Sequence, residues 1–210
     1  MTGIVPATSQ PQTDRTFQRK RGAMIGAVVL AGGNARRLGG VSKGDVVIGG
    51  TTMLQAVTDA CQQAGVPANN IIVVGHAETD LKRTVEDPPR SGPAAGIAAG
   101  LPHVTGERLF ILSCDIPFIA SGLPTLISSF EGDGVCFGGD RPQYLAGLYD
   151  STAIRNQVAS LQNEGGLIGL PVRAIMKPLN ITIIDESEAA RDFDTWDEIE
   201  SARLSESGSS

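Results

Sequence analysis

The sequence predicts an α/β fold, in which a mostly parallel β-sheet carries helices on both faces. Three observations support this prediction. Short apolar runs typical of buried strands alternate along the chain with segments of helical periodicity. Glycine accounts for 26 of the 210 residues, which suits tight turns, and aromatic residues make up only 4%. The length is that of one domain with a sizeable core.

The first half of the chain alternates strand and helix patterns. Met24–Val29 is an uninterrupted apolar run and predicts a buried strand. Thr52–Ala64 alternates apolar and polar residues at helical spacing and stops at a glycine, which predicts a helix. A second buried strand is expected at 70–74, a helix of small residues at 93–101 and a third strand at 108–113.

The second half continues this alternation. In order, the patterns predict a helix at 123–130, strands at 134–137 and 144–149, a helix at 151–161, a glycine-rich turn with room for a short helix at 165–172, a strand at 179–184 and a helix at 195–203. Strands that alternate with helices form parallel βαβ units. Ligands of such open sheets bind beyond the carboxyl ends of the strands, where several unusual residues fall.

Residues 24–203 are expected to form the domain, because the sequence holds no repeat and no linker to a second domain. Residues 1–23 are polar and include a basic cluster at 15–21 but no apolar h-region of their own, unlike a secretory signal. We therefore expect a disordered N-terminal tail or a misassigned start. A second disordered tail is expected at 204–210.

Composition excludes several classes of protein. The net charge of −6 argues against a general nucleic-acid binder, which would present a basic face. No apolar run approaches the roughly 20 residues needed to span a membrane. Cys61, Cys114 and Cys136 are too few and too scattered for a disulfide framework or a zinc site. We expect them to be buried, inert thiols in a reducing cytoplasm.

The most informative segment, Leu30–Lys43, directly follows the first predicted strand. Its glycines allow backbone N–H groups to approach an anion, and Arg36, Arg37 and Lys43 add positive charge. These features predict a phosphate-binding loop of a nucleotide site. The loop is not a Walker A motif, because Gly44 follows the lysine in place of a hydroxyl residue. The alternative is a glycine turn with basic surface residues.

Asp115 comes directly after the apolar strand at 108–113. A carboxylate at the end of a buried strand is costly unless it is paired or binds a metal. Mg²⁺ takes one or two carboxylates together with phosphate oxygens, so Asp115 is a candidate magnesium ligand. The alternative is a turn aspartate or a helix cap.

A second glycine-proline loop, Glu86–Gly96, opens the small-residue helix. Its glycines permit close backbone approach, and Asp87 could accept hydrogen bonds from a ribose or a base. An ordinary strand-to-helix connection is the alternative, because such loops commonly contain glycine and proline.

The segment 191–199 places Asp192 and Asp194 two residues apart, so that on an extended chain their side chains point the same way. Either could be a second metal ligand. Alternatively, Asp194 or Thr195 caps the last helix, with Glu198 completing a capping box.

Other polar residues support no assignment. Residues 141–147 read as an ordinary polar turn before a strand, and His76 and His103 read as surface residues without partners. The sequence offers no arrangement of serine or cysteine with histidine for nucleophilic catalysis.

Four blocks of this sequence, in this order, resemble the molybdenum cofactor guanylyltransferase family, within the sugar-nucleotide type of nucleotidyltransferases. They are residues 30–43, 86–96, 114–118 and 192–199, and they extend over most of 25–202. The resemblance implies a single Rossmann-like nucleotidyltransferase domain. Such an enzyme would use GTP and Mg²⁺ to transfer GMP to the terminal phosphate of molybdopterin, or of its molybdenum form, and release pyrophosphate.

The resemblance also implies roles for individual residues around the nucleoside. The backbone of the loop would bracket the guanine and the phosphates through Leu30, Ala31, Gly32 and Gly33. Gly75 would lie near the base, and Asp87 would contact the nucleoside.

The remaining implied roles concern charge. Lys43 and Arg37 would neutralise the phosphates, and Asp115 would bind Mg²⁺. Asp194, or else Asp192, would be the second carboxylate at the metal. The implied partners are GTP, molybdopterin and other proteins of cofactor biosynthesis or molybdoenzyme maturation, without nucleic acid or membrane.

The chain departs from the family pattern in three places. Ser42 stands where an aspartate often precedes the lysine. Asp45 and the glycine-rich run 44–50 differ from the more apolar run usual after that lysine, and 141–144 lacks the frequent arginine-x-His-Pro pattern. Relatives that use CTP on molybdopterin, or GTP on small phosphorylated acids, share the first block. These activities remain alternatives, together with a nucleotide-binding module that has lost turnover.

Overall fold

The computed structural model describes residues 23–32, 42–139, 141–185 and 189–193. Its main β-sheet has the strand order β5-β4-β1-β6-β8-β7-β9, and β2 and β3 form a separate short hairpin. The strands of the sheet are β1 Ile25–Ala31, β4 Ile71–Gly75, β5 Lys82–Thr84, β6 Arg108–Ser113, β7 Gly134–Gly138, β8 Pro142–Asp150 and β9 Ile181–Ile184. The hairpin joins Val47–Ile48 to Thr51–Thr52.

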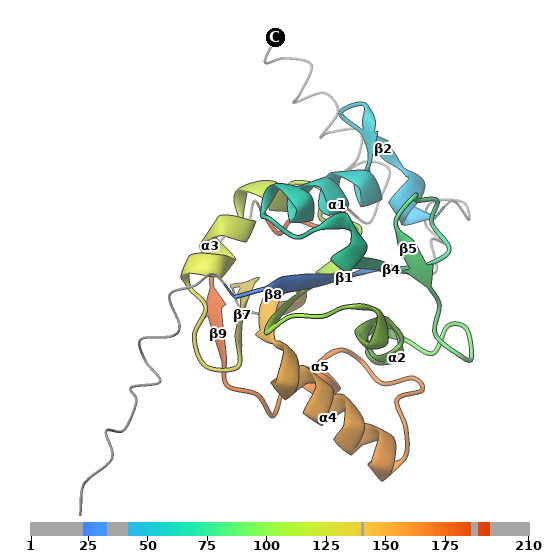
Figure 1. Ribbon diagram of the computed structural model, residues 1–210, viewed down its shortest axis with the longest axis vertical. Coiled ribbons are helices and arrows are strands. Elements are labelled where there is room, and N and C mark those ends of the chain that lie inside the picture. The colour runs from blue at the N-terminus through green and yellow to red at the C-terminus, as the bar shows by residue number, and fades with distance from the viewer. Residues whose placement is uncertain (1–22, 33–41, 140, 186–188, 194–210) are drawn as a thin grey trace, which may run out of the picture.

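The helices cover both faces of the sheet. α1 and α3 lie on one face, and α2, α4 and α5 lie on the other (Figure 1). Their bounds are α1 Met53–Gln63, α2 Pro93–Gly100, α3 Leu123–Ser128, α4 Ser151–Glu164 and α5 Arg173–Met176, and short 3₁₀ turns occupy Lys43–Asp45, Ala68–Asn70, Leu101–His103 and Ile119–Ser121. None of the helices in the described ranges is both long and apolar enough to cross a membrane.

Side-chain caps set the starts of the two longest helices. The Thr52 hydroxyl accepts a hydrogen bond from the Gln55 amide at 3.1 Å, and the Asp150 carboxylate accepts one from the Ala153 amide at 2.8 Å. Each cap satisfies an amide that the first helical turn leaves without a partner.

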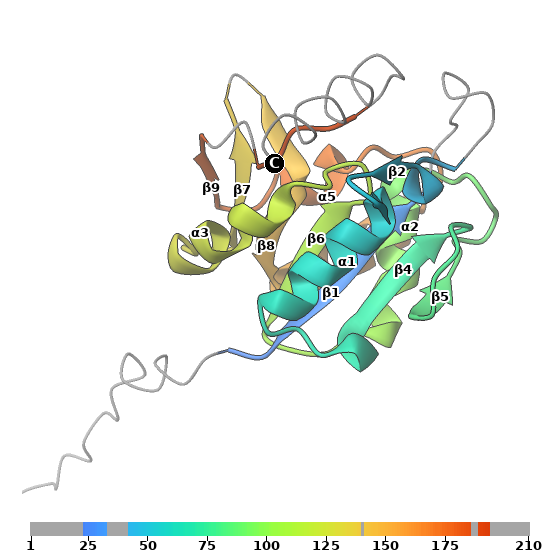
Figure 2. The same cartoon turned by 90° about the horizontal axis from the view of Figure 1, so that it is seen from above.

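Strand direction decides which ends of the strands meet. β5, β4, β1 and β6 run parallel, β8 runs antiparallel to β6 and β7, and β9 runs parallel to β7. In Figure 2, β4, β1 and β6 lie side by side. Their carboxyl ends therefore lie at one edge of the sheet. The amino end of the antiparallel strand β8 lies at the same edge.

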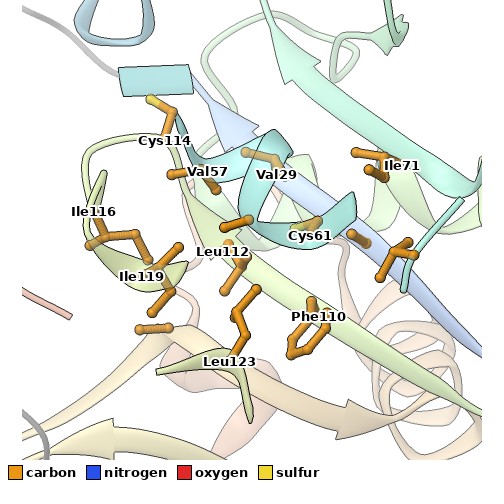
Figure 3. Packing of buried hydrophobic residues seen from close by; sticks show 14 of the residues in the cluster. Val29, Val57, Cys61, Ile71, Phe110, Leu112, Cys114, Ile116, Ile119 and Leu123 are labelled. Carbon is orange, nitrogen blue, oxygen red and sulfur yellow. The ribbon is translucent and has the colours of Figure 1, made fainter. Parts of the chain in front are cut away.

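Apolar side chains from alternate strand positions fill the two faces. On one side Val29 and Phe110 pack with α1 and α3, and Figure 3 shows Val57 and Leu123 among these buried residues. On the other side Val28 and residues such as Ile111 and Ile97 pack against α2, α4 and α5. A sheet buried on both faces explains why its central strands are continuous apolar runs.

The predicted α/β fold, with its mostly parallel sheet, is confirmed. The strand at 108–113 has the predicted bounds, and the other predicted strands and helices within the described residues occur with ends shifted by a few positions. The helix predicted at 195–203 lies outside the described residues.

Three predictions about single elements were wrong or incomplete. The short helix allowed within 165–172 begins instead at Arg173, because Gly165, Gly166 and Gly169 have positive φ angles of 152°, 97° and 76° that a helix does not accommodate. The turn expected from 141 is already strand β8 from Pro142. Strands β2, β3 and β5 were not predicted, because each has only two or three residues, too few to show a periodic pattern.

Candidate functional site

The candidate site lies where β1, β4 and β6 end. Ala31 pairs with Gly75 of β4, and Leu30 pairs with Ser113 of β6. Beyond the end of β6, the Cys114 amide donates a hydrogen bond to the Leu30 carbonyl oxygen at 3.0 Å. The chain leaves β1 through α1 to reach β4 on one side, and it arrives at β6 on the other side through α2. This reversal of strand order is where open α/β sheets bind their ligands.

An ion pair between Lys43 and Asp115 lies at this edge. The Lys43 Nζ atom is 3.0 Å from Asp115 Oδ2, and the two side chains are 22% and 15% exposed. Because both groups are largely withdrawn from water, salt screens their interaction less than it would on an open surface. The fold thus brings together the lysine that ends the first motif and the aspartate of the third.

Close packing fixes the chain directly after Lys43. A Cβ atom on Gly44 would lie 2.9 Å from the Cβ of Ala77 and 3.3 Å from that of Leu54, so only glycine fits without displacement. The next residue, Asp45, accepts a hydrogen bond from the Glu78 amide at 3.1 Å. The glycine and aspartate that depart from the family pattern therefore attach this turn to the segment after β4.

Gly75 ends β4 in a conformation that favours glycine, with φ +142°. A Cβ atom there would overlap the Ala31 carbonyl oxygen and lie 2.9 Å from the Gly32 amide nitrogen. The backbones of β1 and β4 therefore approach without an intervening side chain. This placement brings Ala31, Gly32 and Gly75 together, whereas their nucleotide contacts stay a prediction.

Asp87 lies in the loop that follows β5, and its side chain is exposed. The loop is held by its own hydrogen bonds, from the Arg90 amide to Glu86 Oε1 at 2.8 Å and from the Ser91 hydroxyl to the Pro88 carbonyl. Because β5 runs parallel to β4, the loop begins at the same edge of the sheet as the ion pair. The nucleoside contact of Asp87 stays a prediction.

The segment 189–193 returns to the site from the end of the described chain. The Phe193 amide donates a hydrogen bond to the Asp115 carbonyl oxygen at 3.1 Å, and the Phe193 side chain is fully buried. This contact places the exposed Asp192 next to a residue that is bonded to Asp115. Gly33, Arg37 and Asp194 lie outside the described residues, as does the capping box predicted at 195–198.

The described residues include no group of three or more histidine, cysteine or acidic side chains placed to hold a metal ion. Asp115 nevertheless fits a magnesium site of another kind, because Mg²⁺ is held by one or two carboxylates together with substrate phosphates. Its carboxylate lies beside the end of the glycine segment, where a triphosphate would supply the remaining oxygen ligands.

The three cysteines are buried and carry free thiols. Burial raises the pKa of Cys61 and of Cys114 to about 12, and that of Cys136 to about 11. At neutral pH the thiols are therefore protonated and poor nucleophiles. The prediction of buried thiols is confirmed, and the raised pKa values agree with the expectation that they are inert. His76 and His103 are exposed, as predicted.

Phe193 lies within the last of the four sequence blocks, 192–199, and no role was predicted for it. A single apolar residue between two aspartates shows no periodicity, so the sequence carries no sign that it is buried.

The sequence of this chain is similar to that of known nucleotidyltransferases. Residues 27–182 match the family model of the MobA-like NTP transferase domain. The molybdenum cofactor guanylyltransferase of Serratia proteamaculans is 33% identical over 102 residues, which are 44% of this chain and 49% of that protein. The enzyme of the same name from Acidiphilium cryptum is 32% identical over 145 residues, which are 63% of this chain and 70% of that protein. The chain spans about half the length of several curated relatives that it matches.

A solved structure shares the architecture. The molybdopterin-guanine dinucleotide biosynthesis protein A of Archaeoglobus fulgidus superimposes with a TM-score of 0.64 at 18% identity, covering 88% of this chain and 100% of that one. At this level of identity the likeness is one of fold.

Proposed function

Since the chain belongs to the MobA-like NTP transferase domain family, we propose that it transfers GMP from GTP to the terminal phosphate of molybdopterin, or of its molybdenum form, and releases pyrophosphate. The resemblance drawn from the sequence motifs is confirmed at the level of the family. The nucleotide and the acceptor are the proposed part. The observation that carries the proposal is the Lys43–Asp115 pair at the ends of β1 and β6.

The reaction requires little covalent help from the protein. An oxygen of the acceptor phosphate attacks the α-phosphorus of GTP, and the bond from that phosphorus to the bridging oxygen breaks as pyrophosphate leaves with the electron pair. The attacking oxygen is already anionic, so no strong general base is needed. The protein instead aligns the two phosphates and neutralises the charge that develops on the leaving group.

Lys43 supplies positive charge at the place where the phosphates would lie. Its ammonium group pairs with Asp115 in the described structure and would turn its donors toward the triphosphate when GTP binds. Arg37, which lies outside the described residues, is proposed as a second cation of the same loop.

Asp115 would hold Mg²⁺, with Asp194, or else Asp192, as a second carboxylate. When bound, the ion would supply positive charge to the phosphate oxygens and help to orient them. The described residues contribute the carboxylate and its placement, because the Asp115 backbone is held by the Phe193 amide.

The nucleoside would bind along the backbone at the ends of β1 and β4. The groups proposed to surround it are Leu30, Ala31, Gly32, Gly33, Gly75 and Asp87. No side chain separates the backbones of Ala31 and Gly75, and we propose that the base lies against this part of the sheet edge. Contacts with other proteins of cofactor biosynthesis, and the cytoplasmic location, stay predictions from the sequence.

One experiment tests this function. The full chain is incubated with molybdopterin, Mg²⁺ and each of the four NTPs in turn, and pyrophosphate is measured. Release with GTP alone is the expected result, and D115N serves as the control that should lower it by about 10²–10³-fold. Release with CTP alone would assign a cytidylyltransferase instead. No release with any NTP would favour a nucleotide-binding module without turnover.

A further inference from the structure

We propose that Phe193 is a positioning residue, which keeps Lys43 and Asp115 in the relative positions that binding of the nucleotide requires. The inference rests on the proposed function, because it assigns Phe193 a part in that reaction. Phe193 touches none of the reacting groups named above. It acts through the two segments that carry them.

The first connection is to the backbone of Asp115. The Phe193 amide donates to the Asp115 carbonyl oxygen at 3.1 Å. Asp115 lies beyond the paired residues of β6 and β1, which end at Ser113, and it follows Cys114, whose amide still donates to the Leu30 carbonyl oxygen of β1. The Phe193 amide therefore restrains the peptide group of Asp115 where the sheet no longer does.

The second connection is to the turn and hairpin that follow Lys43. The Phe193 side chain is fully buried and belongs to a small cluster with Val46, Ile48 and Met53. Val46 is bonded in turn to Lys43, because its amide donates to the Lys43 carbonyl oxygen at 3.2 Å. The Phe193 ring, through its packing with Val46, thus restrains the backbone of Lys43.

A third connection lies on the Asp115 side. The rings of Phe118 and Phe193 meet edge to face, with centroids 5.5 Å apart and planes inclined by 71°. Phe118 belongs to the turn after Asp115. Phe193 therefore contacts the chain on both sides of the ion pair, once through its amide and twice through its ring.

The cluster of Phe193 with Val46, Ile48 and Met53 is separate from the apolar clusters on the two faces of the sheet. Loss of the Phe193 ring would therefore remove a link between two segments at the site and leave the packing of the sheet in place. This separation distinguishes a positioning residue from an ordinary core residue.

The test compares F193L with F130L. Leucine keeps apolar volume at residue 193 but loses the ring. Phe130 is the control, because it is a partly buried phenylalanine that packs against the core on the α1 and α3 face and, like Phe193 with Arg191, has an arginine over its ring, Arg108 at 4.0 Å. Arg108 begins β6, so this control lies at the opposite end of that strand from Asp115. F193M is the second variant, in case F193L does not fold.

Two readouts are measured on the full chain. The first is amide hydrogen exchange in residues 44–53 and 115–119, which requires no turnover. The second is steady-state kinetics, which gives separately the change in kcat and the change in the KM for the acceptor. We expect F193L to accelerate exchange in both segments and to lower kcat by about 10- to 100-fold, the effect of a small misplacement of reacting groups, with a smaller change in KM. F130L should do neither.

Unchanged exchange in either segment of F193L would overturn the proposal, as would equal losses of kcat in F193L and F130L. Faster exchange without loss of kcat would also overturn it. If the wild-type chain releases no pyrophosphate, the proposed function fails, whereas the exchange measurement still decides whether Phe193 holds the two segments.

Discussion

Gly75 faces Ala31 so closely that the carbonyl oxygen of Ala31 occupies the space a side chain on Gly75 would need. The two residues end neighbouring parallel strands, where they pair with each other, so no side chain separates the two backbones at the edge of the sheet. A nucleotide site made of backbone requires such an approach, since phosphates and bases must reach N–H groups directly.

Substitution of Gly75 tests this approach. G75A should lower the free energy of unfolding by about 1–3 kcal/mol, because alanine is strained at φ +142° and its Cβ would also overlap Ala31. It should weaken GTP binding as well. Thermal unfolding and calorimetric titration would measure the two effects. G50A is the matched control, because Gly50 has φ +84° but no atom within 4 Å of an added Cβ. A GTP affinity that falls equally in both variants would contradict the assignment of Gly75 to the site.

Lys43 is expected to bind the phosphates. K43A should weaken GTP binding by about 10- to 100-fold, which is the loss of a charge-assisted hydrogen bond, and should leave guanosine binding nearly unchanged. Titrations with both ligands would measure the difference. K177A, which removes an exposed lysine after α5, is the control. Equal losses for GTP and guanosine would show instead that Lys43 shapes the loop.

Asp115 is expected to place the metal. D115N should keep the fold but lower Mg²⁺-dependent turnover by about 10²–10³-fold, the cost of losing preorganised charge stabilisation. Pyrophosphate release and circular dichroism would measure both properties. D133N is a suitable control, because Asp133 accepts a hydrogen bond from the Asn180 amide at 2.9 Å outside the site. Near-normal turnover of D115N would assign Asp115 to a structural turn.

The base preference is the least constrained property of the site. Guanine presents O6 as an acceptor and its N1 and N2 groups as donors, a pattern that backbone groups near Leu30 and Gly75 could match. A wrong base would leave buried polar groups without partners at about 1–3 kcal/mol each. We therefore expect GTP to bind at least about tenfold more tightly than ATP, because 1.4 kcal/mol already corresponds to that ratio. A calorimetric titration with all four NTPs would check this, and tighter binding of CTP would refute it.

The buried thiols predict a loss of stability at alkaline pH. Burial raises the pKa of Cys61 and of Cys114 from 9.0 to about 12, and that of Cys136 to about 11. Above pH 9 the unfolded chain therefore releases protons that the folded chain retains, so stability is full below pH 9 and falls as pH rises. Each thiol should contribute a loss of roughly 1 kcal/mol per pH unit. Denaturant unfolding between pH 8 and pH 10 would measure the slope, and the variant with all three cysteines replaced by alanine should show a shallower one.

Much of the fold could be predicted because its central strands are buried on both faces. The strand at 108–113 is an uninterrupted apolar run, and its bounds in the structure are those predicted. β5 could not be found in this way, because Lys82 and Arg83 are exposed on the outermost strand. The order of the strands depends on long-range pairing, for which no local pattern exists.

In the candidate site, too, local sequence patterns predicted some features, whereas others depend on long-range contacts. Glycines and a carboxylate directly after apolar runs predicted that Gly32 and Asp115 would lie at one edge, because the ends of parallel strands meet there. The pairing of Lys43 with Asp115 joins residues 72 positions apart and could not be read from either motif. The contact of Phe193 with Asp115 likewise depends on where the last described segment crosses the fold.

The bond between the Phe193 amide and Asp115 has a consequence for the order in which the protein is made. On a chain that emerges from the ribosome, all strands of the main sheet are available once residue 184 has emerged, since β9 is the last of them. The restraint on Asp115 becomes available only when residue 193 has also emerged. A growing chain would therefore acquire most of its sheet before its site was complete, and a product truncated after β9 would keep the paired strands without the final restraint on Asp115.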